Sequence, residues 1–360
     1  MDVRIIISAG GTGGHIYPAI AIINKIKEMN KKADILYIGT TDRMEKDIIP
    51  NLGIDYYALK IDGIYNKNPF HMLNALYLTV VGIIKCKKII RKFKPDIVIG
   101  VGGYVTVPVL YAAHKLHIKT LLHEQNRVPG KANKFLGNFV DTICVSMKKT
   151  QDYFPNSQVV FTGNPRSEEA LNAKVGNKAK YGLAKEKKLV LITTGSLGAS
   201  TINDVIASLL PNFRPKSYQV LLVTGKDNYD FMKRVSVPKN VQIVPYLDDM
   251  LGVLKFTDLI VSRAGASTIS EITALEIPSI LIPSPYVANN HQVENAKELS
   301  DVGAAILIEE KDLTKELLLK NIDKIINDQD IYKKMSKSAK KLGIASSVSL
   351  IYNEIEKLMK

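Results

Sequence analysis

Cysteine is scarce in this chain of 360 residues: only Cys86 and Cys144 are present. One falls on a predicted helix and the other on a predicted strand. They therefore form neither a disulfide framework nor the paired knuckles of a structural metal site. Such scarcity fits the reducing environment of the cytosol.

Long apolar runs are also missing. No stretch reaches the roughly 18–20 apolar residues that a membrane-spanning helix needs. The nearest is Leu73–Ile84, which is shorter and is interrupted by Asn74, Thr79 and Gly82. The chain enters its first strand directly, without the pattern of a signal peptide. We therefore expect neither a transmembrane span nor a secretory leader.

Acidic residues are outnumbered, with 35 Asp and Glu against 49 Lys and Arg and a net charge of +14. The excess is uneven, because residues 1–164 hold 22 basic against 12 acidic side chains. A partner that favours positive charge should therefore meet mainly the first half. Nucleic acid, an anionic membrane and a phosphorylated substrate all fit this description.

Short apolar runs alternate with helical patterns along the whole chain, which predicts α/β domains with parallel sheets. The length favours two such domains. We expect an N-terminal Rossmann-like domain over 1–164, a second over 165–345, and a last helix over 346–360 that packs back on the first. The predicted strands are Val3–Ser8, Ile35–Ile38, Ile97–Gly100, Thr120–His123, Thr142–Val145, Val159–Thr162, Leu189–Thr193, Val220–Thr224, Val241–Val244, Leu259–Ser262, Ser279–Ile282 and Ala304–Ile308.

Two glycine-rich turns follow strands, at residues 10–15 and 194–199. Each would place backbone N–H groups and a helix N-terminus where a phosphate or another polar ligand binds. Neither is a P-loop, because the terminal Gly-Lys-Ser/Thr is missing. The first is not a dinucleotide fingerprint either, because Ile16 stands where the third glycine is required. Two turns of this kind predict two nucleotide-type domains that face each other across a substrate.

Polar residues gather at several further strand ends, where open parallel sheets bind ligands. Most are uncharged, which suits a sugar better than a hydride cofactor. The segments are Gly102-Gly103-Tyr104, His123-Glu124-Gln125-Asn126, Tyr246–Met250, Ser262–Glu271 and Asn289–Gln292.

In order along the chain, these segments resemble the MurG-type glycosyltransferases, which add N-acetylglucosamine to a lipid-linked muramyl-pentapeptide. The resemblance implies the GT-B architecture of two Rossmann-like domains, with UDP-N-acetylglucosamine as donor. It also implies an inverting transfer without a metal or cofactor. The motifs that carry it are Gly10–His15, Gly39–Glu45, Gly102–Tyr104, His123–Asn126, Gly163–Arg166, Ser262–Glu271 and His291-Gln292.

His15 is the first candidate for the catalytic base that takes the proton of the acceptor hydroxyl. A capping or packing histidine is the alternative. Glu124 is a second catalytic candidate, and His123 and Tyr104 are expected on the acceptor side. At the end of that strand, a hydrogen-bonded structural pair is an equally good interpretation of His123 and Glu124.

The resemblance assigns most other polar positions to the donor. Glu271 would accept hydrogen bonds from the ribose hydroxyls, although Thr268 and Glu271 also have the spacing of a helix capping box. Two departures weaken the match: Thr194 stands where the family often has glycine, and Arg166 follows Pro165 immediately. The expected donor-binding residues are Thr12, Gly13, Gly14, Asn126, Arg166, Ser196, Leu247, Ala266, Ser267, Thr268, Glu271 and Gln292.

A basic, apolar stretch lies at 73–94. Leu73, Leu76, Tyr77, Val80 and Ile84 can share a helical face, and lysines and arginines follow them. One interpretation is a buried helix with a solvated basic end. The other is an interfacial helix that contacts an anionic membrane, which would place the protein on the cytoplasmic face of the cell membrane. Other cell-wall synthesis proteins are further candidate partners. Nucleic acid fits less well, because no reader motif is present.

Two patterns resemble metal sites. His114 and His117 lie three apart but have no acidic or cysteine partner nearby, so we interpret them as surface or packing residues. Asp328-Gln329-Asp330 has the form of a metal-binding DxD motif, but it lies between two late helices, so we interpret it as a turn with a helix cap.

Three rival functions remain open from the sequence. One is another lipid glycosyltransferase, such as a diacylglycerol glycosyltransferase. A second is a UDP-sugar 2-epimerase on the same fold. The third is a non-enzymatic basic protein that binds membrane or RNA.

Overall fold

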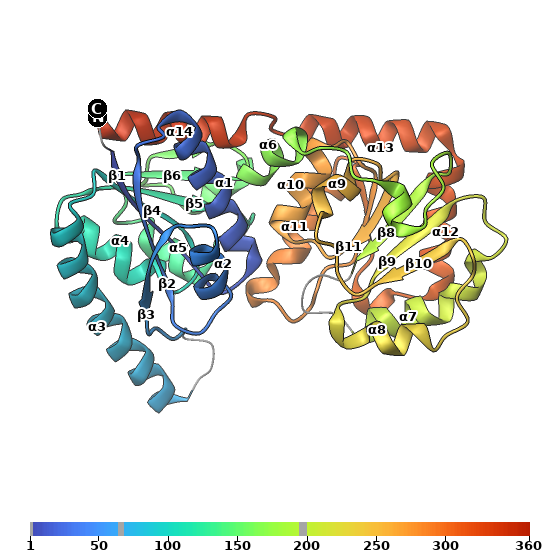
Figure 1. Ribbon diagram of the computed structural model, residues 1–360, viewed down its shortest axis with the longest axis horizontal. Helices are drawn as coiled ribbons and strands as arrows, with labels where there is room; N and C mark the ends of the chain where they lie inside the picture. Colours follow the sequence, from blue (N-terminus) through green and yellow to red (C-terminus); the bar gives the residue numbers. More distant parts are fainter. Residues whose placement is uncertain (1–2, 64–67, 194–199) are drawn as a thin grey trace. The chain divides into compact units, whose positions relative to one another are not determined.

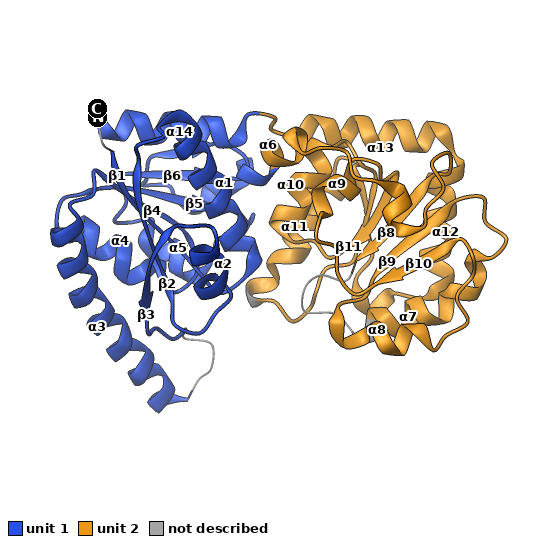
Figure 2. Ribbon diagram, in the orientation of Figure 1, with its two compact units in different colours: residues 1–166, 346–360 blue, residues 167–345 orange. Residues whose placement is uncertain are grey.

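The computed structural model describes residues 3–63, 68–193 and 200–360. The chain forms two compact units (Figure 2). Unit 1 is Met1–Arg166 together with Ser346–Lys360, and unit 2 is Ser167–Ala345. Each unit is built on its own parallel β-sheet (Figure 1).

The sheet of unit 1 has seven strands. They are β1 (Arg4–Ala9), β2 (Asp34–Thr40), β3 (Asp55–Leu59), β4 (Ile97–Gly102), β5 (Lys119–Glu124), β6 (Thr142–Val145) and β7 (Val159–Phe161). They lie in the order β3-β2-β1-β4-β5-β6-β7, and every neighbouring pair is parallel. The strand order reverses between β1 and β4, and such a switch point opens a crevice beyond the carboxyl ends of the two strands.

Helices cover both faces of this sheet. They are α1 (Gly13–Met29), α2 (Glu45–Asn51), α3 (Pro69–Phe93), α4 (Thr106–Lys115), α5 (Lys131–Leu136) and α14 (Ser347–Met359), and α6 (Pro165–Asn172) spans the boundary between the units. On one face α14 packs beside α1 and buries Val348, Ile351 and Ile355 in the same core as β1. On the other face α3 and α4 pack together over β4 and β5. A buried Ile contributes about 1.5–3 kcal/mol, so α14 is an integral part of unit 1.

The sheet of unit 2 has six parallel strands. They are β8 (Leu189–Thr193), β9 (Gln219–Val223), β10 (Val241–Val244), β11 (Leu259–Ser262), β12 (Ser279–Leu281) and β13 (Ala305–Leu307). Their order is β10-β9-β8-β11-β12-β13, with a switch point between β8 and β11. The helices are α7 (Ser200–Leu209), α8 (Lys226–Lys233), α9 (Met250–Leu254), α10 (Ala266–Ala274), α11 (His291–Ser300), α12 (Lys315–Asn327) and α13 (Gln329–Leu342).

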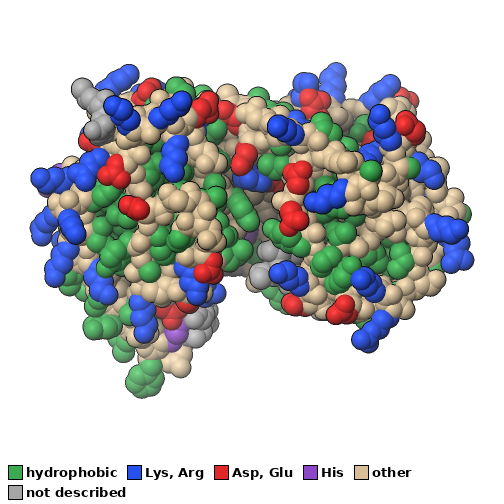
Figure 3. All heavy atoms as spheres, viewed as in Figure 1, with side chains coloured by type: hydrophobic (Ala, Val, Ile, Leu, Met, Phe, Trp, Pro, Cys, Tyr) green, Lys and Arg blue, Asp and Glu red, His purple; other side chains and the backbone are tan. Residues whose placement is uncertain are grey.

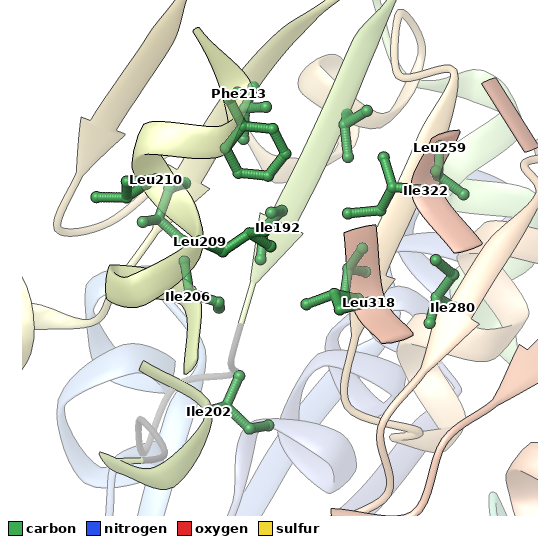
Figure 4. Close-up of a cluster of buried hydrophobic side chains, with 14 of the residues drawn as sticks. Ile192, Ile202, Ile206, Leu209, Leu210, Phe213, Leu259, Ile280, Leu318 and Ile322 are labelled. Atoms are coloured by element: carbon green, nitrogen blue, oxygen red, sulfur yellow. The ribbon is translucent and has the colours of Figure 1, made fainter. Parts of the chain in front are cut away.

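The main core of unit 2 lies between its sheet and the helices α7 and α12 (Figure 4). Ile206 of α7 and Leu318 of α12 are both fully buried in it, against Ile192 of β8. Both helices alternate apolar and polar residues with a helical period, so each presents one apolar face to the sheet.

The predicted strands match the structure closely, and Thr142–Val145, Leu189–Thr193, Val241–Val244 and Leu259–Ser262 match it residue for residue. Strand β3 was missed. Of its residues only Leu59 is buried, because β3 is an edge strand, so it has no continuous apolar run. Among the predicted helices, the last one corresponds to α14.

Candidate functional site

The first glycine turn lies at the switch point of unit 1. It joins β1 to α1, and the Gly10 N–H donates to the Gly102 carbonyl at the end of β4 (3.1 Å). The backbones of the two loops lie so close together that a side chain on Gly103 would collide with the Gly10 carbonyl. Gly102 and Gly103 both have positive φ, at 116° and 90°, which glycine adopts without strain. The predicted loops Gly10–His15 and Gly102–Tyr104 therefore meet at one place.

His15 lies in the first turn of α1 and is partly buried. Its Nδ1 is 3.1 Å from the Gly10 carbonyl, and a side chain on Gly102 would overlap its ring. When Nδ1 donates to this carbonyl, the neutral imidazole carries its lone pair on Nε2. Thr12 is the N-cap residue of α1, and Gly13 and Gly14 are its first two residues, with no acidic residue in the first turn.

Glu124, at the end of β5, is almost completely buried. Its carboxylate accepts four hydrogen bonds, from the Asn126 backbone (2.8 Å) and side chain (3.2 Å), the Gly130 N–H (3.1 Å) and the Asn133 side chain (2.8 Å). Burial raises the pKa of this carboxyl group, and the hydrogen bonds oppose the rise. Glu124 thus ties Asn126 to the strand end. Asn133 was not predicted.

His123 is completely buried beside Glu124. Its Nε2 is 3.1 Å from the Gly163 carbonyl, and its Nδ1 is 3.1 Å from the side-chain nitrogen of Gln125. Burial lowers the pKa of His123 to about 4, so the ring is neutral at physiological pH. Tyr104, in contrast, is 43% exposed, and its ring lies against Gly63 in the loop that precedes α3.

Arg166 ends unit 1. Its guanidinium lies over the Tyr17 ring, 5.5 Å from the ring centroid. Its backbone N–H donates to the side-chain oxygen of Asn164 (3.0 Å).

In unit 2, the predicted donor residues cluster at the carboxyl ends of strands. Ala266, Ser267, Thr268 and Glu271 lie on α10, directly after β11. Ser267 Oγ is buried and accepts no hydrogen bond from the described residues. The alternative capping box is wrong, because it needs Thr268 as the N-cap of α10, whereas the N-cap is Gly265, three residues before Thr268. Ser196, in the second glycine turn, lies outside the described residues.

A cavity of about 390 Å³ lies beyond the ends of β12 and β13, and none of the predicted donor residues lines it. The neighbouring Gln292 side chain accepts a hydrogen bond from the Ser284 N–H (2.8 Å), which fixes it at the start of α11. Leu247 is buried, whereas Tyr246 is 55% exposed. The cavity is lined by Pro283, Pro285, Tyr286, Asn290, Val293, Glu309, Glu310 and Lys311.

The two patterns that resembled metal sites have other roles. Asp328 caps α13, because its side chain accepts from the N–H groups of Asp330 and Ile331 (3.0 Å each), which confirms the predicted turn and cap. The His114 ring packs against Phe139 (5.5 Å between ring centroids). Within residues 3–63, 68–193 and 200–360, no group of three His, Cys, Asp or Glu residues could hold a metal ion.

Helix α3 carries an exposed apolar face. Leu73, Leu76 and Tyr77 are 57–65% exposed, so the interpretation of this stretch as a buried helix is wrong for that face. The opposite side packs through Gly82 and Cys86 against the sheet and α4. Figure 3 shows hydrophobic side chains at the lower left, where Figure 1 places α3, and basic side chains along the edge above them. No helix in the described part of the chain is long and apolar enough to span a membrane.

Comparisons with known proteins agree with this geometry. Residues 5–145 match the glycosyltransferase family 28 N-terminal domain, and residues 189–351 match the family 28 C-terminal domain. The UDP-N-acetylglucosamine–N-acetylmuramyl-(pentapeptide) pyrophosphoryl-undecaprenol N-acetylglucosamine transferase of Bacillus cytotoxicus is 47% identical over 99% of this chain and 100% of its own length.

Two solved structures cover nearly the whole chain. The crystal structure of MurG from Acinetobacter baumannii has a TM-score of 0.79 and 25% identity, covering 99% of both chains. A UDP-GlcNAc 2-epimerase from Neisseria meningitidis, bound to UDP-GlcNAc, has a TM-score of 0.70 at 16% identity, covering 99% of this chain and 100% of its own. The second likeness shows the fold alone. The predicted GT-B fold class is confirmed. The chain belongs to the MurG-type glycosyltransferases of family 28.

Proposed function

We propose that this protein transfers N-acetylglucosamine from UDP-N-acetylglucosamine to the C4 hydroxyl of the muramyl sugar in undecaprenyl-pyrophosphoryl-MurNAc-pentapeptide. The observation that carries the proposal is the 47% identity to the Bacillus cytotoxicus transferase across the full length of both chains. The product would be the disaccharide lipid used in peptidoglycan synthesis. The α-linked donor would give a β-linked product in a single displacement.

His15 is the proposed general base. It belongs to the loop at the switch point of unit 1, and its Nδ1 contact with Gly10 suits a neutral ring that accepts a proton at Nε2. The four hydrogen bonds to the Glu124 carboxylate favour a supporting role for Glu124, which holds Asn126 in place. The buried His123 would support the same strand end, and the exposed Tyr104 would contact the acceptor.

Unit 2 is the proposed donor side. The N–H groups at the N-terminus of α10 and the buried Ser267 hydroxyl would stabilise the negative charge that develops on the leaving UDP. Glu271 would bind the ribose hydroxyls and Gln292 the sugar hydroxyls. We propose that Thr12, Gly13, Gly14, Arg166, Ser196, Leu247, Ala266 and Thr268 complete the donor contacts. Leaving-group stabilisation by these donors requires neither metal nor cofactor.

We also propose that α3 is a membrane-contacting helix on the cytoplasmic face. Its exposed apolar face would enter the acyl boundary, while Lys85, Lys88 and Arg91 would meet anionic headgroups. The lipid-linked acceptor would then diffuse to the protein within the membrane. The charge excess of residues 1–164 supports this placement and favours a membrane over nucleic acid as the anionic partner.

The test is an assay of the purified protein with UDP-N-acetylglucosamine and a lipid-linked muramyl-pentapeptide analogue. We expect a β-linked disaccharide product, and little transfer from UDP-galactose. Transfer to diacylglycerol but not to the muramyl lipid would refute the assignment. Conversion of the donor without an acceptor, followed by NMR, would instead reveal a 2-epimerase.

A further inference from the structure

Glu45 is a completely buried carboxylate outside the residues assigned above. It is the first residue of α2, close behind the end of β2. Three neutral donors hold it. The Thr40 N–H (3.0 Å) and hydroxyl (2.7 Å) donate to Oε1, and the Gly11 N–H donates to Oε2 (3.3 Å). One carboxylate therefore joins the end of β2 to the first glycine turn, two segments that are adjacent at the carboxyl edge of the sheet.

Two glycines make room for this side chain. A Cβ on Gly10 would lie 2.5 Å from Glu45 Oε1, and a Cβ on Gly39 would lie 2.7 Å from Glu45 Cγ. Real Cβ atoms do not approach other atoms so closely. Gly10 and Gly39 thus leave room for the Glu45 side chain, and Gly39 also leaves room for Tyr56, whose hydroxyl a Cβ would approach to 2.5 Å.

The link to His15 passes through a single peptide group. In the peptide group between Gly10 and Gly11, the N–H donates to Glu45 Oε2 (3.3 Å), and the carbonyl oxygen lies 3.1 Å from His15 Nδ1. Its flanking residues are both glycine, and Gly11 has a φ of 95°. Such a peptide can rotate at low cost unless both of its ends are held. Rotation would remove the Glu45 and His15 contacts together.

We propose that Glu45 is a positioning residue for His15. By fixing the Gly10–Gly11 peptide, it keeps the carbonyl in the orientation that accepts from Nδ1, and so keeps Nε2 as the proton acceptor. This inference rests on the proposed transferase function. A small loss of alignment at a general base lowers turnover strongly, so the effect should fall on kcat.

The test is a double-mutant cycle of Glu45→Gln and His15→Ala. The glutamine keeps the size of the side chain and one acceptor, but its NH2 group cannot accept from Gly11. We expect kcat to fall about tenfold or more while KM for UDP-N-acetylglucosamine changes less than about threefold. In the His15→Ala background, Glu45→Gln should cause no further loss, because Glu45 acts through His15.

Glu354→Gln is the matched control, because Glu354 is another buried carboxylate of unit 1, on α14 away from the site. It should leave kcat unchanged. Two results would overturn the inference. One is a Glu45→Gln protein with unchanged kcat, and the other is an equally large further fall in kcat when Glu45→Gln is added to His15→Ala. If Glu45→Gln does not fold, the same cycle applies to Glu45→Asp, which keeps the charge but is one methylene shorter. Absence of transfer by the unaltered chain would refute the proposed function itself.

Discussion

Arg263 and Glu310 form an ion pair at 2.5 Å between the segments that follow β11 and β13. Both side chains are largely buried, and Arg263 also donates to the Ile282 and Pro283 carbonyls beyond β12 (3.2 Å each). One guanidinium therefore connects three strand ends, directly before the N-terminus of α10. Neither residue was predicted as an ion pair, because they lie 47 positions apart.

Glu310→Gln should destabilise the protein by about 3 kcal/mol, because it leaves a buried guanidinium without its counter-charge. Denaturant unfolding measures this change. The control is Glu276→Gln, which removes an exposed partner of Lys340 and should cost less than about 1 kcal/mol. Equal effects of the two variants would contradict the importance that we assign to burial of the Arg263–Glu310 pair.

His15→Ala should lower kcat by about a hundredfold or more, because general-base catalysis contributes that much. KM for UDP-N-acetylglucosamine should change little. Steady-state kinetics with both substrates measures the effects on kcat and on KM separately. His114→Ala, which removes a ring packed on Phe139 outside the site, should leave kcat intact. Unchanged turnover in His15→Ala would exclude His15 as the base.

The stability of the protein should depend on His123 in mildly acidic solution. Its pKa falls from 6.5 to about 4 on folding, so the unfolded chain binds more protons between these values, and stability is lost as the pH falls through that window. The full contribution is about 3 kcal/mol. Unfolding free energies from pH 7 to 4 should therefore decline more steeply for the wild type than for His123→Gln.

Burial raises the pKa of Glu124, which makes the folded state more stable as the pH falls and so opposes the effect of His123. The informative quantity is therefore the difference in unfolding free energy between the wild type and His123→Gln. Parallel pH profiles for the two proteins would show that His123 does not titrate in this way.

Replacing Leu73 and Leu76 together by serine should weaken binding to anionic vesicles by about tenfold or more, because two exposed apolar side chains would no longer enter the lipid. Vesicle sedimentation measures the partition. Val175→Ser in unit 2 removes an equally exposed apolar side chain and should have no effect. Binding that survives the double substitution would move the membrane contact elsewhere.

The strands and their order along the chain were predictable because central parallel strands are buried on both faces and appear as unbroken apolar runs, as in Ile97–Gly102. Edge strand β3 has no such run, and its position depends on pairing with β2. Similarly, Thr268 and Glu271 have the spacing of a capping box, but the N-cap of α10 is Gly265, three residues before Thr268, and spacing alone does not reveal where the helix begins.

Candidate residues could be proposed from the sequence where a motif lies at or soon after a strand end: Glu124 ends β5, His15 lies in the first turn of α1, and Glu271 lies on α10, the helix after β11. The supporting contacts were not. The motif Gly39–Glu45 marked a strand end, yet the contact of Glu45 with Gly11 depends on the pairing of β1 with β2, over a separation of 34 residues. Asn133 holds Glu124 only because α5 returns to the end of β5.

The core of unit 1 includes Ile351 and Ile355 of α14, which follow the whole of unit 2 in the sequence. During synthesis, unit 2 can therefore complete its core while unit 1, although its synthesis began first, still lacks the helix α14 that covers one face of its sheet. The half of the protein that is synthesised first is the half that finishes folding last.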